Sequence, residues 1–139
     1  MKKYIDEIIK LSKKSLTYGD VPVGAIVVKD GTIIGKGCNT REKNNDIMGH
    51  AEINAIRKAS KNVKNWNLQG CNLFVTLMPC TICMNIIKQC RIDNVYYLLD
   101  KPANKKEFDR VAVKQIDSKD DIKKYNNILS NFFTNLRVK

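Results

Sequence analysis

The sequence predicts an α/β protein built on a five-stranded mixed sheet whose first two strands form an antiparallel hairpin. Three observations lead to this prediction. Two apolar runs, 21–28 and 32–38, flank Asp30-Gly31, a turn dipeptide typical of β-hairpins. Later short apolar runs are separated by segments of helical length, which is the pattern of parallel crossovers. Amphipathic segments near both ends of the chain indicate helices that pack on the sheet.

The first half of the chain contains the hairpin and the segments that flank it. Residues 2–18 are predicted to form a helix, since isoleucines and leucines recur on one face and lysines on the other. Gly19-Asp20 marks its end. The β-branched run 21–28 is predicted to be a buried strand that pairs with 32–38. The polar stretch 40–49 is predicted to be a loop.

The second half alternates strands and helices. A helix is expected over 50–59, a strand over 72–77 and a helix over 79–89, with Pro79 in its first turn because that position needs no N–H. The remaining expected elements are strands at 92–99 and 111–116 and a helix at 120–137, while 102–109 stays unassigned.

Length and charge limit what the protein can be. At 139 residues, the chain is most simply one domain, 1–139. No apolar run reaches the roughly 18 residues of a membrane span, and the N-terminus lacks a signal-peptide core. The expected location is therefore intracellular and cytoplasmic, with no membrane partner. The net charge of +11 favours a polyanionic partner, nucleic acid first, although a solvated lysine-rich surface would give the same value.

The five cysteines fall into two groups. Their odd number and the lack of an export signal make a disulfide framework unexpected. Cys38, Cys71 and Cys90 stand among apolar or strand-like neighbours and are interpreted as small buried side chains. Cys80 and Cys83 form the only Cys-x-x-Cys of the chain.

These two cysteines and the single histidine predict a zinc site. Cys80 and Cys83, three residues apart, are expected in the first turn of the helix 79–89, where they present their sulfurs on one face. Free N–H groups there favour thiolates. His50 supplies a third ligand from another helix. A catalytic zinc site has three protein ligands and keeps a fourth position for water. We therefore expect one Zn²⁺ per chain.

Glu52 is the candidate proton carrier beside this metal. It is not needed as a ligand, and it could act as general base and then general acid toward zinc-activated water. Residues two apart on a regular helix face different ways, so His50 must lie at the irregular helix start, an entry that Gly49 would ease. Three alternatives remain: a fourth cysteine ligand in a structural zinc site, a redox pair of Cys80 and Cys83, and a surface role for Glu52.

The motifs resemble a known family. His-x-Glu followed by Pro-Cys-x-x-Cys is the signature of zinc-dependent nucleobase deaminases. Within the cytidine and deoxycytidylate deaminase superfamily, the chain is most similar to the bacterial tRNA adenosine deaminases. The stretches that carry this similarity are 20–25, 50–53, 76–83, Arg91-Ile92, and 129–133 followed by Arg137.

This resemblance implies a three-layer α/β/α cytidine-deaminase-like fold and a specific reaction. The reaction is the hydrolysis of adenosine to inosine, with release of ammonia, at the wobble position of a tRNA anticodon. The expected partners are the anticodon loop of a tRNA for arginine and a second copy of the chain in a homodimer. The resemblance assigns the metal to His50, Cys80 and Cys83, and the proton transfers to Glu52. It assigns substrate contacts to Asn39, Val23 and the Ala51 backbone N–H.

The chain departs from the family pattern at three places. Met78 stands where the family usually has Glu, Asn85-Ile86 replaces a Gly-Ala pair, and 100–106 replaces a glycine-rich stretch. A deaminase of free guanine, cytosine or cytidine would share the zinc chemistry and is the alternative function. A non-enzymatic RNA-binding module is disfavoured, because all four motif side chains are intact.

Overall fold

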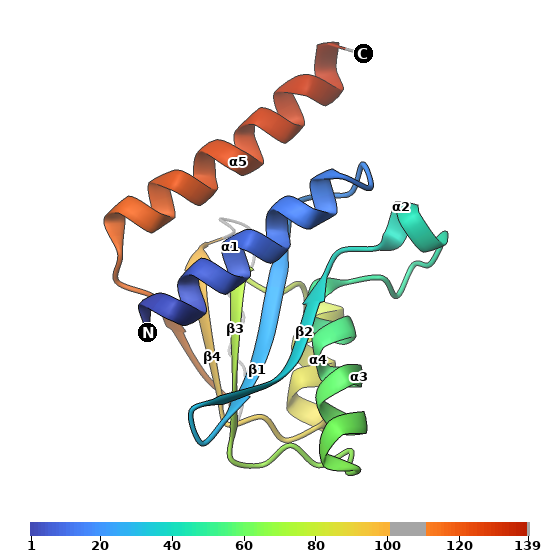
Figure 1. The fold of residues 1–139 in the computed structure, drawn as a ribbon, viewed down its shortest axis with the longest axis vertical. Helices are drawn as coiled ribbons and strands as arrows, with labels where there is room; N and C mark the ends of the chain where they lie inside the picture. The colour runs from blue at the N-terminus through green and yellow to red at the C-terminus, as the bar shows by residue number, and fades with distance from the viewer. Residues whose placement is uncertain (101–110, 139) are drawn as a thin grey trace.

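The computed structural model describes residues 1–100 and 111–138, and Figure 1 shows their fold. The helices are α1 (Lys2–Leu16), α2 (Arg41–Asn44), α3 (Ala51–Val63), α4 (Thr81–Gln89) and α5 (Lys119–Val138). The strands are β1 (Gly24–Lys29), β2 (Thr32–Cys38), β3 (Cys71–Leu77), β4 (Asn94–Leu99) and β5 (Ala112–Gln115). None of the helices in these residues has the length and apolar character needed to cross a membrane.

The strands form one mixed sheet in the order β2-β1-β3-β4-β5. β1 pairs antiparallel with β2, as the hairpin signal predicts, and also antiparallel with β3. β3, β4 and β5 are parallel. The predicted five-stranded mixed sheet is therefore confirmed. The β1–β3 pairing was not predicted, because it joins segments that are more than forty residues apart.

Helices cover both faces of the sheet (Figure 1). On one face, Gly24 of β1 packs against α1, and α5 joins α1 there through an ion pair between Lys2 and Asp121. On the other face, Gly35 and Gly37 of β2 pack against α3, which lies beside α4. This is the three-layer α/β/α arrangement that the family resemblance implies.

Local corrections concern the ends of elements and the polar stretch 40–49. That stretch contains the one-turn helix α2, because the Asp20 carboxylate accepts the backbone N–H of Glu42 at 2.8 Å. Helix α4 begins at Thr81, so Pro79 precedes the helix and is not in its first turn. Helix α3 continues to Val63, and β1 starts at Gly24 after Pro22. The unassigned stretch 102–109 lies outside the described residues.

Gly37 sets how closely α3 approaches the sheet. A methyl group at this position would overlap the Ala51 carbonyl oxygen and lie 2.6 Å from the Ala55 nitrogen. We expect Gly37→Ala to lower the free energy of unfolding by about 1–3 kcal/mol or more, because backbone atoms cannot yield as side chains can. Urea denaturation measures the change. Thr32→Ala, at an exposed position of the same strand, is the control and should change stability much less.

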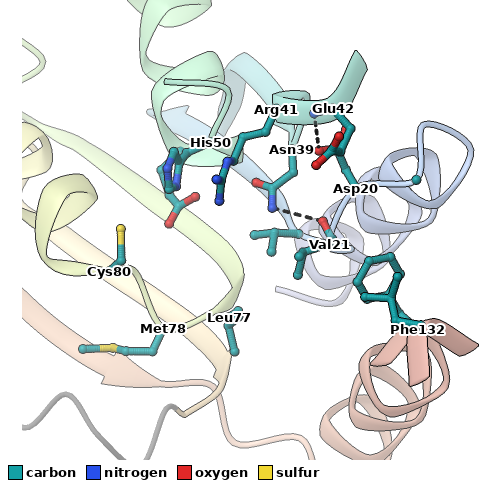
Figure 2. A pocket seen from close by; sticks show the side chains of 14 residues that line it. Asp20, Val21, Asn39, Arg41, Glu42, His50, Leu77, Met78, Cys80 and Phe132 are labelled. Carbon is teal, nitrogen blue, oxygen red and sulfur yellow. Dashed lines mark hydrogen bonds between the residues drawn. The ribbon is translucent and has the colours of Figure 1, made fainter. Parts of the chain in front are cut away.

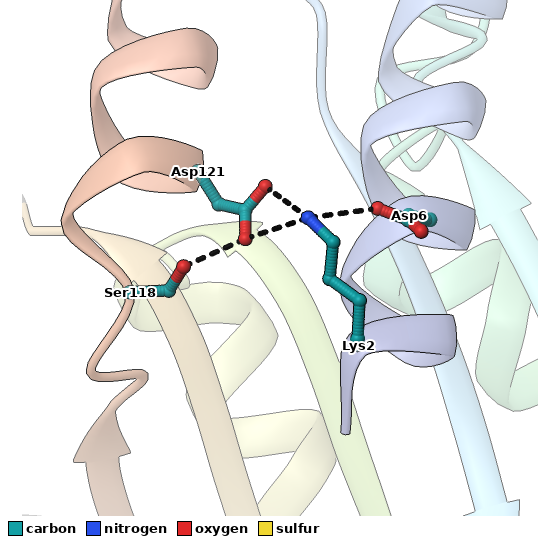
Figure 3. Close-up of polar contacts among 4 residues, drawn as sticks. All are labelled: Lys2, Asp6, Ser118 and Asp121. Carbon is teal, nitrogen blue, oxygen red and sulfur yellow. Dashed lines mark hydrogen bonds and ion pairs between the residues drawn. The ribbon is translucent and has the colours of Figure 1, made fainter.

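The start of α5 is tied to α1 by a charge cluster, which Figure 3 shows. The Lys2 ammonium lies 2.8 Å from Asp121 Oδ1, and the Ser118 hydroxyl donates to Asp121 Oδ2 at 2.6 Å. The hydrogen bond from Lys2 is the main cause that lowers the pKa of Asp121 below its ordinary value of 3.8, and Ser118 adds to it. The carboxylate form is therefore favoured in the folded protein.

A pH dependence of stability follows from the lowered pKa of Asp121. The contribution is fully present above the unfolded pKa near 3.8 and is lost as the pH falls through the lower folded pKa. We expect Asp121→Asn to reduce the melting temperature modestly at pH 7. The difference from wild type should shrink below pH 4. Melting temperatures at pH 7, 5 and 3 measure this, and a difference that grows in acid would contradict the assignment.

Candidate metal centre and adjoining pocket

His50 lies at the N-cap of α3, where the backbone is still extended (φ −90°, ψ 143°). The helix begins one residue later, so the His50 side chain does not follow the helical spacing to Glu52. This is the irregular entry that the sequence requires. The reason for Gly49 differs from the one expected. It does not have a positive φ. A side chain there would collide with the backbone of Thr40 and Arg41, the nearest atom being 2.7 Å away.

The two cysteines take different places at the start of α4. Cys80 is the N-cap residue (φ −72°, ψ 172°), and its carbonyl accepts the N–H of Met84 at 2.9 Å. Cys83 lies in the first turn and is fully buried. The sequence placed both in the first turn, and the structure places only Cys83 there. The N-cap still lies at the positive end of the helix dipole, which stabilises a thiolate.

The structure brings His50, Cys80 and Cys83 together. Their ligand atoms all lie within 4.8 Å of one another. Zinc bonds of about 2.0–2.3 Å in a tetrahedron place donor atoms roughly 3.5–4 Å apart, which this cluster can accommodate with small adjustments. Among the described residues, no fourth His, Cys, Asp or Glu joins the cluster. Cys38, Cys71 and Cys90 are buried elsewhere as free thiols. The donor set therefore matches a catalytic zinc site better than a structural one.

Electrostatics at the cysteines favour a thiolate. A hydrogen bond from Cys83 is the main cause that lowers the pKa of Cys80 to about 5, and the Cys83 backbone N–H and the charge of His50 also contribute. The hydrogen bond with Cys80 and burial raise the pKa of Cys83, and nearby Glu52 adds to this. The pair therefore shares one proton, held by Cys83, and Cys80 carries the negative charge that a metal cation would bind.

Glu52 is buried beside this cluster, with 4% of its surface exposed. It lies in the first turn of α3 and interacts with the Cys83 thiol. A surface role for Glu52 is therefore excluded by its burial. A carboxylate this close to three metal donors, and outside the donor set, is placed to exchange protons with a molecule held at the metal.

A cavity of about 330 Å³, here called the site pocket, opens at the metal cluster. Its size is that of a small-ligand site. Figure 2 shows Asn39, Arg41, Glu42 and His50 on one side and Cys80, Met78 and Leu77 on the other. The residues that line it are Gly19, Asp20, Val21, Val23, Asn39, Arg41, Glu42, His50, Glu52, Leu77, Met78, Cys80, Phe132 and Leu136.

The three predicted substrate-binding residues lie together but differ in access. Val23 and Asn39 line the site pocket, whereas Ala51 is fully buried and does not. Asn39 donates to the Val21 carbonyl at 3.0 Å, and its side-chain oxygen accepts the Ala51 N–H at 2.9 Å. The single hydrogen of the Ala51 amide is therefore already used within the protein.

Arg41 and Phe132 are among the pocket residues that sequence reasoning missed. Arg41 stands in the stretch expected to be a plain loop, and its side chain points into the pocket near His50 (Figure 2). A lone arginine in a polar stretch gives no local signal of this placement. Phe132 reaches the pocket from α5. Its motif was noted as a resemblance, but only the packing of α5 on α1 shows where the ring lies.

Comparison of the sequence with known protein families identifies the family to which the chain belongs. The model of the cytidine and deoxycytidylate deaminase zinc-binding region matches residues 1–99. The chain belongs to this deaminase family. The family binds zinc, and the cluster of His50, Cys80 and Cys83 is where the chain can hold the ion.

Several similar proteins within this deaminase family act on tRNA. A tRNA-specific adenosine deaminase of Streptococcus pyogenes serotype M18 (strain MGAS8232) is 43% identical over 94 residues, which cover 68% of this chain and 59% of the relative. The chain thus matches less than two thirds of that relative. The tRNA-specific adenosine deaminase of Buchnera aphidicola subsp. Schizaphis graminum (strain Sg) is 39% identical over 127 residues, 86% of this chain and 84% of the relative.

Among solved structures, one from a study of A-to-I editing by tRNA:A34 deaminases at the wobble position has a TM-score of 0.76. It is 28% identical to this chain, and the match covers 83% of this chain and 98% of that one. The predicted membership in the cytidine and deoxycytidylate deaminase superfamily, with similarity to tRNA adenosine deaminases, is confirmed.

Proposed function

We propose that this chain, as one deaminase domain over 1–139, hydrolyses adenosine to inosine at the wobble position of a tRNA anticodon. The observation that carries the proposal is the three-donor cluster of His50, Cys80 and Cys83 with buried Glu52 beside it, opening into a pocket of small-ligand size. The names of the relatives support adenosine in tRNA as the substrate.

Each side chain has a defined task in this reaction. His50, Cys80 and Cys83 would hold Zn²⁺, which when bound lowers the pKa of a water molecule and supplies a nucleophile at neutral pH. Glu52 would accept the proton of the attacking water. It would deliver this proton to a ring nitrogen of adenine, then take the second proton from the newly added hydroxyl and pass it to the departing amine, so that ammonia leaves and inosine remains. Burial of Glu52 excludes bulk water from this transfer.

Val23, Asn39 and Ala51 would orient the nucleoside. Val23 offers an apolar wall to the base, and the second N–H of the Asn39 amide is free of the contact with Val21 and can reach a ligand. A contact from the Ala51 N–H to the base would require exchange of its hydrogen bond with Asn39. Asn39 would therefore contact the substrate while it bonds to Val21, before β1, and to Ala51, at the start of α3.

The proposed partners are the anticodon loop of a tRNA for arginine and a second copy of this chain, and the proposed location is the cytoplasm. An unpaired base in a loop enters a pocket without the cost of breaking a base pair. The net charge of +11 suits an RNA partner.

The decisive experiment measures inosine in a tRNA for arginine that carries adenosine at the wobble position. The same tRNA with guanosine there is the control, and zinc is quantified in the same sample. We expect inosine at that position alone. Absence of inosine with excess zinc-loaded enzyme would reject the proposal. Ammonia release from free guanine, cytosine or cytidine, without benefit from RNA, would establish the alternative function.

A further inference from the structure

A second depression, here called the basic groove, lies on the other side of α2 from the site pocket. Its cationic side chains come from three helices: Lys14 of α1, Lys43 of α2, and Arg57, Lys58 and Lys61 of α3. The groove crosses β2, the edge strand of the sheet, where α1 and α3 flank the hairpin from opposite faces.

The positive charge of the basic groove is not balanced by the protein. No Asp or Glu is among the residues that line it. Within residues 1–100 and 111–138, the ion pairs involve Lys2 and Lys36, and none of the five groove cations. All five cationic residues are exposed. Five like charges around one depression repel one another, and a polyanion bound there would relieve this repulsion.

The basic groove and the site pocket share a wall, residues 38–44, here called the ridge. Asn39, Arg41 and Glu42 of the ridge line the site pocket. Thr40 and Lys43 line the basic groove. A strand of RNA whose base enters the site pocket therefore has a direct route for its backbone across the ridge and into the groove.

The ridge is held in place by contacts with α3 and with the segment between α1 and β1. Asn54 of α3 donates to the Cys38 carbonyl and to the Thr40 hydroxyl, each at 2.9 Å. The Lys43 ammonium lies 4.4 Å from the centre of the ring of Tyr18, just after α1, so its side chain is held at this ring. Together with the hydrogen bond from Glu42 of α2 to Asp20, these contacts fix the position of the site pocket relative to the basic groove.

We propose that the basic groove binds the phosphate backbone of the RNA strand whose reacting base occupies the site pocket. The proposal rests on the proposed function and adds to it where the RNA continues after the reacting nucleotide. Arg57, Lys58 and Lys61 repeat on one face of α3 and present exposed charges, which suit phosphate groups and carry no base information. Binding there is accordingly independent of sequence and sensitive to salt.

The test compares two triple variants that change the net charge equally. The groove variant is Arg57→Gln, Lys58→Gln and Lys61→Gln, in which glutamine preserves helix propensity. The control variant is Lys114→Gln, Lys119→Gln and Lys123→Gln. These three lysines are exposed on β5 and at the start of α5, at the opposite edge of the sheet from β2. Zinc content and melting temperature establish that both variants are folded.

We expect the groove variant to bind the tRNA at least tenfold more weakly than the control variant at about 0.1 M salt. The slope of log affinity against log salt should fall by about 2 for the three lost contacts. Equal affinities and slopes for the two variants would overturn the proposal. A groove variant that loses self-association but keeps its RNA affinity would overturn it too, because the groove would then be a protein interface.

The same measurements separate failure of this proposal from failure of the proposed function. If wild type forms inosine and the two variants bind RNA equally, only the groove assignment is wrong. If wild type binds tRNA through the groove but forms no inosine, the groove assignment stands and the assigned reaction is wrong. If wild type neither binds tRNA nor forms inosine, both are rejected.

Discussion

Replacing Glu52 with glutamine is expected to reduce the rate of adenosine deamination at least about a thousandfold, within the usual range of general acid–base catalysis. The substitution preserves the size of a side chain that is 96% buried, since only 4% is exposed. It removes the group that accepts and returns the proton. The measurement is a single-turnover rate of inosine formation with zinc-loaded enzyme.

Two further measurements make the Glu52→Gln result specific. Zinc content should remain one ion per chain, because Glu52 is not among the three donors. The affinity for tRNA should stay within a few-fold of wild type, because the basic groove is unchanged and glutamine keeps the size of the Glu52 side chain in the pocket wall. Turnover within tenfold of wild type would remove Glu52 from the mechanism. A loss of zinc would show that the residue serves the metal site instead.

Removal of a metal ligand should have a different result from removal of Glu52. We expect Cys83→Ala to lose nearly all bound zinc and all deamination. It should also lose the stabilisation that a bound ion provides, about 3–4 kcal/mol for zinc at 100–1,000 times its dissociation constant. Metal analysis and thermal denaturation, each with and without a chelator, measure these effects. A chelator should lower the melting temperature of wild type and leave that of Cys83→Ala unchanged.

Cys71→Ala is the matched control for Cys83→Ala. Both cysteines are buried, with 1% and 0% of their surfaces exposed, but Cys71 lies in β3 outside the donor cluster. The two substitutions remove the same sulfur atom from a packed interior. Cys71→Ala should therefore keep its zinc and its response to the chelator. Equal loss of zinc in both variants would mean that packing, and not ligation, explains the result.

Local patterns predicted much of this fold, because each depends on neighbours in the chain. The turn at Asp30-Gly31 and the amphipathic spacing of α1 are examples, and both elements form where expected. Local patterns failed at α2. Its single turn depends on the Asp20 carboxylate, about twenty residues earlier in the chain. They also did not reveal that a side chain at Gly49 would collide with the backbone of Thr40 and Arg41.

The sequence by itself determined the chemistry. A histidine, two cysteines three apart and a spare carboxylate are side-chain identities, and the reaction they suit follows from donor chemistry alone. Only the tertiary structure decided their convergence, since α3 and α4 meet through the order of strands in the sheet. It also decided that Arg41 and Phe132 share the pocket and that Lys14 faces the lysines of α3. These contacts join distant parts of the chain, and their positions depend on packing that no local pattern encodes.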